Sequence, residues 1–125
     1  MPGSFIIKPL QATLLHDLDN IGHMDPYCKF TIGHHSVKSC IAKNAGLHPK
    51  WDDILKLRQK HDEKYCRVVL KDHDTISFDD YIGEVNVPLE PAMSAGKVKG
   101  WYTLFNKQRL AGEVQLEIEY DPNEK

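Results

Sequence analysis

The sequence predicts an all-β protein, built as a two-sheet sandwich of antiparallel strands. Eight short segments alternate apolar and polar residues with a period of two, and turn-forming residues separate them at regular spacing. No segment of any length repeats its apolar residues with the period of a helix. A closed barrel stays open as an alternative, because alternation alone does not distinguish closure from stacking.

The clearest expected strand is the last one, in which Val114, Leu116 and Ile118 alternate with polar residues. One helical turn is expected within Glu90–Gly100. We expect a single domain over residues 1–125, with its core at about 5–120 and a flexible tail at 121–125. The expected strands are Phe5–Leu15, Tyr27–Gly33, Ser36–Ala42, Trp51–Arg58, Cys66–Leu70, Tyr81–Leu89, Trp101–Phe105 and Gly112–Tyr120.

The composition narrows the class of function. A formal net charge of -2 and a sequence pI of about 6.4 argue against nucleic-acid binding, which usually brings a basic excess. No apolar run is long enough to span a bilayer, and no signal peptide is expected at the start. The three cysteines are spread out without a C-x-x-C pair, as is typical of reduced thiols in a cytosolic protein.

An acidic stretch, Leu70–Glu84, lies between two of the expected strands. Asp72 and Asp74 are two residues apart, so their side chains leave the same face of an extended backbone. If the chain then loops back, it brings Asp80 against them. The mutual repulsion of these carboxylates favours a hard cation with flexible oxygen coordination, and calcium fits best. An acidic, solvated loop is the open alternative.

A second acidic loop follows the first expected strand. Asp19 and Asp25 flank Gly22, which allows a tight bend, and Pro26 restricts the backbone where the next strand begins. Alternate connections of a sandwich end at the same tip, so the two acidic loops can meet there. Five carboxylates would then supply oxygen for two or three calcium ions, with help from the backbone carbonyl of His73.

Three blocks of the sequence resemble one family. They are Asp19-x-x-Gly22-x-x-Asp25-Pro26-Tyr27, then His48-Pro49-Lys50-Trp51-Asp52-Asp53, then Asp72-x-Asp74 followed by Asp80-x-Ile82-Gly83-Glu84. Together they resemble the C2 domain, a calcium- and phospholipid-binding module found in protein kinase C, synaptotagmin and small plant single-domain proteins. The resemblance runs from about Leu10 to Tyr120 and implies an eight-stranded Greek-key sandwich of the second, permuted (type II) topology rather than type I.

The resemblance also implies which residues hold metal. The five ligand positions of the family fall on aspartate here, while His48 stands where the family usually has Asn and Met24 where it often has Ser. Asp79 has no ligand counterpart and is expected to be solvated. The predicted metal site consists of Asp19, Asp25, Asp72, Asp74 and Asp80, with Leu18, His73 and Ser77 as further contributors.

The implied mechanism is an electrostatic switch at a membrane. Calcium reverses the sign of the local potential, so that an anionic phospholipid surface is attracted rather than repelled. Four apolar residues in the two loops, Ile21, Met24, Ile76 and Phe78, are predicted to contact the membrane. Lys29 and Lys38 are a thin candidate phosphoinositide patch, for which two solvated lysines are the simpler interpretation. We expect a cytoplasmic protein that is reversibly recruited to membranes.

Three other functions compete with this interpretation. The first is a zinc site, but His34 and His35 are adjacent on a turn, and no Cys/His spacing fits a structural zinc site. The Asp72-His73-Asp74 run invites acid–base chemistry, but no nucleophile or oxyanion feature accompanies it, so no catalytic residue is predicted. The serious alternative is a protein-interaction or scaffold module of the same fold that does not bind lipid.

Overall fold

The computed structural model describes residues 3–16 and 23–123, and it confirms the predicted all-β class. The strands lie in one continuous order, β3-β2-β5-β6-β7-β8-β1-β4, and every neighbouring pair is antiparallel. The elements are β1 (Ser4–Leu14), β2 (Pro26–Ile32), β3 (His35–Lys38), β4 (Leu55–Arg58), β5 (Tyr65–Asp72), β6 (Asp80–Pro88), α1 (Glu90–Ala95), β7 (Lys97–Asn106) and β8 (Arg109–Asp121).

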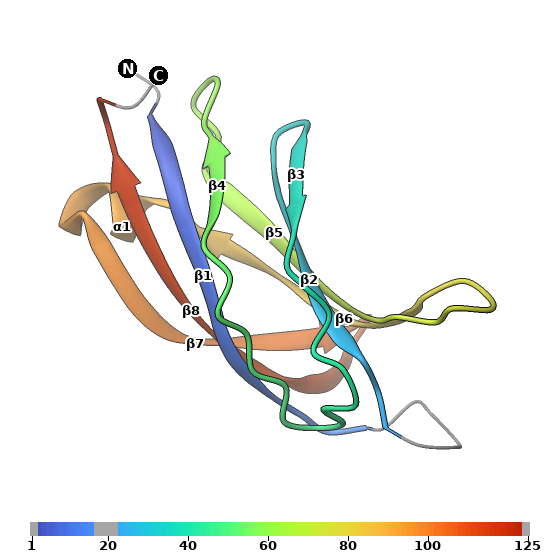
Figure 1. The fold of residues 1–125 in the computed structure, drawn as a ribbon. Coiled ribbons are helices and arrows are strands. Elements are labelled where there is room, and N and C mark those ends of the chain that lie inside the picture. Colours follow the sequence, from blue (N-terminus) through green and yellow to red (C-terminus); the bar gives the residue numbers. More distant parts are fainter. Residues whose placement is uncertain (1–2, 17–22, 124–125) are drawn as a thin grey trace.

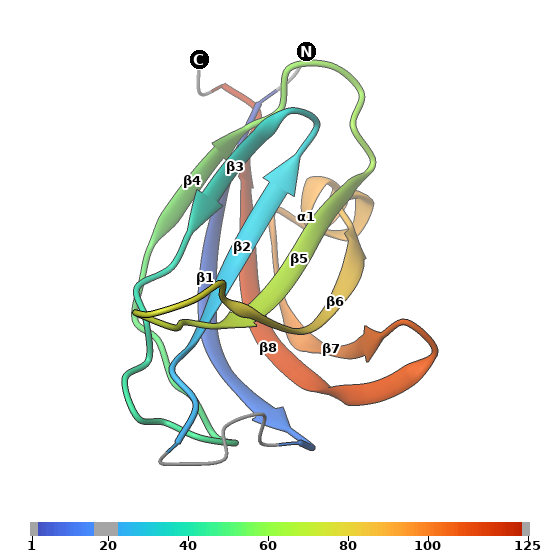
Figure 2. The same cartoon turned by 90° about the vertical axis from the view of Figure 1, so that its right-hand side faces the viewer.

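The sheet folds into two halves because its middle joint is weak. Strands β6 and β7 share only one registered pair, Glu84 with Phe105. The half β3-β2-β5-β6 therefore turns to face the half β7-β8-β1-β4, as Figures 1 and 2 show. The edge strands β3 and β4 come close to each other, which nearly closes the sandwich. The permuted topology implied by the family resemblance stays a prediction.

The core lies between the two halves. Phe5, Ile7 and Leu116 come from the second half, Phe30 and Leu70 come from the first, and none of these side chains is exposed to solvent. The alternation seen in the sequence explains the burial, because successive side chains of a strand point to opposite faces. Burying each of these large side chains contributes about 1.5–3 kcal/mol.

Two expected strands are shorter in the structure. β3 ends at Lys38, because the Ser39 side chain accepts a hydrogen bond from the Cys28 N–H at 2.9 Å and the Ala42 N–H bonds to Pro26 O instead of continuing the ladder. β4 begins at Leu55 rather than Trp51, which is buried and pairs its N–H with Leu10 O. Conversely, β7 is longer than expected because its pairing with β8 extends back to Lys97.

The loops expected to carry the function lie away from the chain ends. In Figures 1 and 2 the end of β1, the start of β2 and the β5–β6 loop occupy the half of the molecule opposite the two termini. The β5–β6 loop, drawn in yellow, projects from the body of the sandwich. The one short helix in the described ranges, α1, confirms the helical turn expected within Glu90–Gly100 and lies in the other half of the molecule.

Candidate functional site

Three of the predicted acidic positions meet where the neighbouring strands β2, β5 and β6 begin or end. Asp72, the last residue of β5, is the cross-strand partner of Pro26 in β2 and of Asp80 in β6. The Asp25 N–H donates to Asp72 Oδ1 at 2.8 Å, and the His73 N–H donates to the backbone oxygen of Asp25 at 3.1 Å. The end of the β1–β2 loop therefore lies beside the start of the β5–β6 loop, as the sequence predicted for Asp25 and Asp72.

The pairing of Asp72 with Asp80 has an electrostatic consequence. Directly opposed like charges on adjacent strands destabilise a sheet, because their β-carbons are only about 4.5–5.5 Å apart. Asp72 is also almost completely buried, at 2% exposure, whereas Asp80 is exposed, so water screens only one side of the pair. A cation bound beside Asp72 and Asp80 would relieve the repulsion, and carboxylate and carbonyl oxygens are the ligands that calcium prefers.

A third loop is tied to the same place. Asp25 Oδ1 accepts a hydrogen bond from the Asn44 N–H at 2.5 Å, and Asn44 adopts a positive φ of 57° that brings its amide to the carboxylate. Beneath them, the Trp51 indole donates to Pro26 O at 3.3 Å, and the ring is buried. The start of β2 is thus held by the chain between β3 and β4 as well as by β5.

Asp74 shapes the β5–β6 loop. Its Oδ1 accepts the N–H groups of Ile76 and Ser77 at 2.9 and 3.3 Å, and its Oδ2 accepts the Ser77 hydroxyl at 3.0 Å. These bonds, first among them the Ile76 N–H, hold the pKa of Asp74 below its ordinary value. Asp74 is therefore a carboxylate at neutral pH, and in this conformation its oxygens accept hydrogen bonds from residues of its own loop.

Asp79 is bound on several sides, so the expectation that it is a solvated neighbour is wrong. The Tyr27 hydroxyl donates to Asp79 Oδ2 at 2.5 Å, the Asp74 N–H donates to Oδ1 at 3.0 Å, and His73 Nδ1 lies 3.5 Å from Oδ1. The Tyr27 hydrogen bond is the main cause that lowers the pKa of Asp79. Desolvation, and then the bond to Asp79, raises the pKa of Tyr27 to about 12. These contacts form a brace between the loop and β2.

The brace has only a faint signal in the sequence. Tyr27 opens a strand directly after Asp25-Pro26, and Asp79 directly precedes a predicted ligand, but no spacing rule links the two. Their contact depends on the antiparallel pairing of β2 with β5 and of β5 with β6, which brings the start of β2 beside the β5–β6 loop. Tertiary pairing, rather than local pattern, makes Asp79 a structural residue.

The full predicted metal set is not assembled in the part of the chain that the structure describes. Within residues 3–16 and 23–123, no three His, Cys, Asp or Glu side chains form a group that could hold a metal ion. Asp25 and Asp72 are in contact, whereas Asp74 is engaged by Ile76 and Ser77. Asp19 and Leu18 lie outside the described residues. The five-carboxylate site stays a prediction.

The predicted membrane contacts divide clearly. Ile76 and Phe78 are 95% and 94% exposed at the tip of the β5–β6 loop. Met24 is fully buried in the hydrophobic core, so its predicted membrane contact is wrong: a residue beside Asp25 faces inward where β2 begins. Ile21 lies outside the described residues.

The two lysines of the candidate phosphoinositide patch are cross-strand partners. Lys29 is half-buried and Lys38 is exposed, with its Nζ 5.9 Å from the centre of the Tyr27 ring. Lys38 borders a shallow hollow of about 240 Å³ that is also lined by His73 and Asp79. Because the Asp79 carboxylate lies in the same hollow, the patch is not purely positive.

The cysteine side chains give little support to a metal site built from thiolates. Cys28 and Cys66 are buried, and burial raises the pKa of both thiols, that of Cys66 to about 12, so neither is a ready thiolate ligand.

None of the helices in the described ranges is long and apolar enough to cross a membrane.

Comparison with known proteins identifies the family. The C2 domain model matches residues 3–104. The chain is 32% identical to 16 kDa phloem protein 2 of Cucurbita maxima, over 89% of this chain and 86% of that protein. It is 26% identical to 16 kDa phloem protein 2 of Arabidopsis thaliana, over 98% of this chain and 84% of that protein.

A solved structure agrees with these matches. It is a C2 domain-containing protein whose name refers to an elicitor-responsive gene, with a TM-score of 0.84 and 25% identity over 98% of this chain and 90% of the other. The predicted family resemblance is thus confirmed, and this chain belongs to the C2 domain family.

Proposed function

We propose that this protein binds anionic phospholipid membranes in a calcium-dependent manner, through the loops at the end of the sandwich away from its termini. One observation carries the proposal. The β5–β6 loop has directly opposed carboxylates, Asp72 and Asp80, at its base and two almost fully exposed apolar side chains, Ile76 and Phe78, at its tip. Membership of the C2 family, in which calcium binding is common, supports it.

The residues proposed to hold calcium offer oxygen only. They are Asp25, Asp72, Asp74 and Asp80 with the carbonyl of His73, together with Ser77, Asp19 and Leu18. Bound calcium would neutralise the carboxylates and offer open coordination positions to lipid phosphate or carboxylate groups. The Asp25 N–H already orients Asp72, whereas recruiting Asp74 would compete with its bonds from Ile76 and Ser77.

The exposed side chains would supply the apolar part of the binding. Ile76 and Phe78 are almost fully open to solvent, and burying a side chain of this size in an apolar phase contributes at most about 1.5–3 kcal/mol. Two of them on one projecting loop suit shallow insertion between headgroups. The neutralised carboxylates at the base would remove the repulsion that otherwise keeps the tip away from an anionic leaflet.

The proposal also covers catalysis, location in the cell and the class of ligand. We assign the chain no catalytic role, place it in the cytoplasm with reversible recruitment to membranes, and expect its ligand to be lipid. C2 family members bind membranes and proteins, so a protein partner is the alternative outcome of the experiment.

The experiment is sedimentation with vesicles of phosphatidylcholine and phosphatidylserine, in calcium and in chelator. The wild type should pellet with vesicles only in calcium. The Ile76→Ala/Phe78→Ala variant should bind at least about tenfold more weakly, because two buried side chains are lost. Ile54→Ala is the matched control: Ile54 is 70% exposed but lies outside this loop, and its removal should change nothing.

The outcomes separate the candidates. Equal pelleting in calcium and chelator, or no pelleting in either, would reject calcium-dependent lipid binding and leave the protein-interaction module. Calcium-dependent pelleting that is unaffected in Ile76→Ala/Phe78→Ala would reject insertion of the β5–β6 loop.

A further inference from the structure

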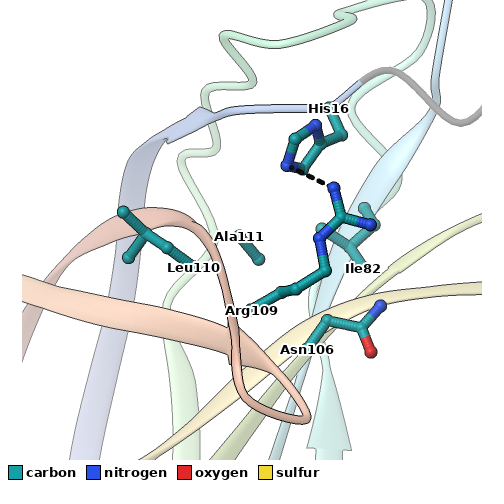
Figure 3. A pocket seen from close by; sticks show the side chains of 6 residues that line it. All are labelled: His16, Ile82, Asn106, Arg109, Leu110 and Ala111. Atoms are coloured by element: carbon teal, nitrogen blue, oxygen red, sulfur yellow. Dashed lines mark hydrogen bonds between the residues drawn. The ribbon is translucent and has the colours of Figure 1, made fainter.

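A second hollow lies between the end of β1 and the hairpin that joins β7 to β8, and none of its lining residues is a predicted metal ligand. Its volume is about 150 Å³. Figure 3 shows Arg109 reaching from β8 to the ring of His16, which follows β1. The lining residues are His16, Ile82, Asn106, Arg109, Leu110 and Ala111.

Each polar side chain of this hollow offers at least one hydrogen-bond donor. Arg109 Nη2 lies 3.2 Å from His16 Nε2, and a guanidinium can only donate, so a neutral His16 carries its hydrogen on Nδ1. Asn106 adds an amide from the residue that pairs with Arg109 across the hairpin. Among the described residues, none that lines the hollow is acidic and Arg109 has no ion-pair partner. Such a set is suited to an oxyanion.

The other lining residues of the hollow are apolar. Ile82 and Ala111 line the hollow and are 5% and 4% exposed. The Arg109–His16 bond itself is exposed to solvent, so these walls shape the hollow without excluding water from the guanidinium. Leu110 is 50% exposed at the hollow and, with the 47% exposed Leu15, also lines the neighbouring hollow. The guanidinium of Arg109 thus lies beside exposed apolar side chains, an arrangement that suits the phosphate of a lipid headgroup.

We propose that the hollow formed by His16, Asn106 and Arg109 binds a phosphate group. Arginine recognises phosphate through two parallel N–H bonds, and the volume of the hollow admits one such group. The hairpin lies in the half of the molecule away from the termini, as the β5–β6 loop does, but on a different side. The proposal uses none of the acidic residues and does not rest on the calcium-dependent function.

The first arm of the test is an amide NMR titration with inorganic phosphate, in chelator. Signals of His16, Asn106 and Arg109 should shift saturably in the wild type. Arg109→Gln should bind about tenfold more weakly, the value of one charge-assisted interaction. Lys97→Gln, which removes an equal charge from the exposed far end of β7, is the matched control and should bind like the wild type. Arg109 is exposed, so both variants should unfold at the wild-type temperature.

The second arm distinguishes a lipid phosphate from a soluble one. Vesicles of phosphatidylcholine and phosphatidic acid are sedimented with the three proteins in calcium. Weaker vesicle binding by Arg109→Gln than by Lys97→Gln identifies a headgroup phosphate; unchanged vesicle binding with weaker phosphate binding identifies a soluble one. The proposal is overturned if no saturable phosphate shift occurs, or if Arg109→Gln matches Lys97→Gln in both arms. A wild type that does not pellet rejects the calcium function, while the first arm still decides this one.

Discussion

The β1–β8 pair and the β5–β6 loop are held in different ways. β1 and β8 pair along almost their whole length, from Ser4 with Asp121 to Leu14 with Gly112, above the hydrophobic core. The loop makes no such ladder and is shaped by the carboxylates of Asp74 and Asp79. We call the paired strands β1 and β8 the frame. Because the frame is held by packing, it tolerates little change. The β5–β6 loop is held by polar groups, so it can be altered, and can bind ligands, without loss of the fold.

The largest effect is expected in the frame. Gly112 has a φ of 144°, and a β-carbon there would lie 2.3 Å from Thr13 O. Gly112→Val should therefore lower the free energy of unfolding by roughly 2–4 kcal/mol through strain and a backbone clash. Chemical denaturation measures the change, with Gly100→Val as the control because a β-carbon at Gly100 meets nothing within 4 Å. Equal stability of the two variants would contradict the account of the frame.

Removing charge from the loop should affect ligand binding without harming the fold. Asp72→Asn/Asp74→Asn should lower calcium affinity at least about tenfold, since two charged ligands are lost. In chelator the free energy of unfolding of the single variant Asp72→Asn should equal or exceed that of the wild type, because the Asp72–Asp80 repulsion is relieved and the amide oxygen introduced at position 72 can still accept the Asp25 N–H. Calorimetry with calcium and denaturation in chelator test the two statements separately. A large loss of metal-free stability contradicts this picture of the site.

The brace should make a smaller contribution. Tyr27→Phe removes the hydrogen bond to Asp79 and should cost about 0.5–1.5 kcal/mol in free energy of unfolding. It should also speed hydrogen exchange of the Asp74 amide, which donates to the same carboxylate. Tyr102→Phe is the control, because Tyr102 is half-buried in β7, away from this loop. Unchanged exchange at Asp74 would show that the brace does not order the loop.

The smallest effect is a dependence of stability on acid. The pKa of Asp79 is lowered from its ordinary value of 3.8 in the folded protein, chiefly by the Tyr27 hydroxyl. Its contribution is therefore fully present above pH 3.8 and is lost as the pH falls through the lower folded-state pKa. Denaturation in chelator between neutral and acid pH should show a shallower decline in Asp79→Asn than in the wild type. A parallel decline would mean that other carboxyl groups carry all of the acid sensitivity.

Local pattern predicted the β-sheet well and its irregular edges poorly. Alternation located all eight strands, because burial of one face forces a period of two. It overextended β3, where the Ser39 hydroxyl replaces a ladder bond, and β4, where Trp51 packs inward. Side chains that compete with the backbone, or that pack beyond the end of a strand, leave the pattern of apolar residues unchanged and so cannot be read from it.

The same division holds at the site. The spacing of Asp72 and Asp74 and the apolar residues Ile76 and Phe78 are local properties, so the sequence alone identified an acidic loop with an apolar tip. Which groups face one another was decided by the pairing of distant strands. That pairing placed Asp25 against Asp72, turned Met24 into the core and joined Asp79 to Tyr27, because contacts between strands depend on register and burial across the whole sheet.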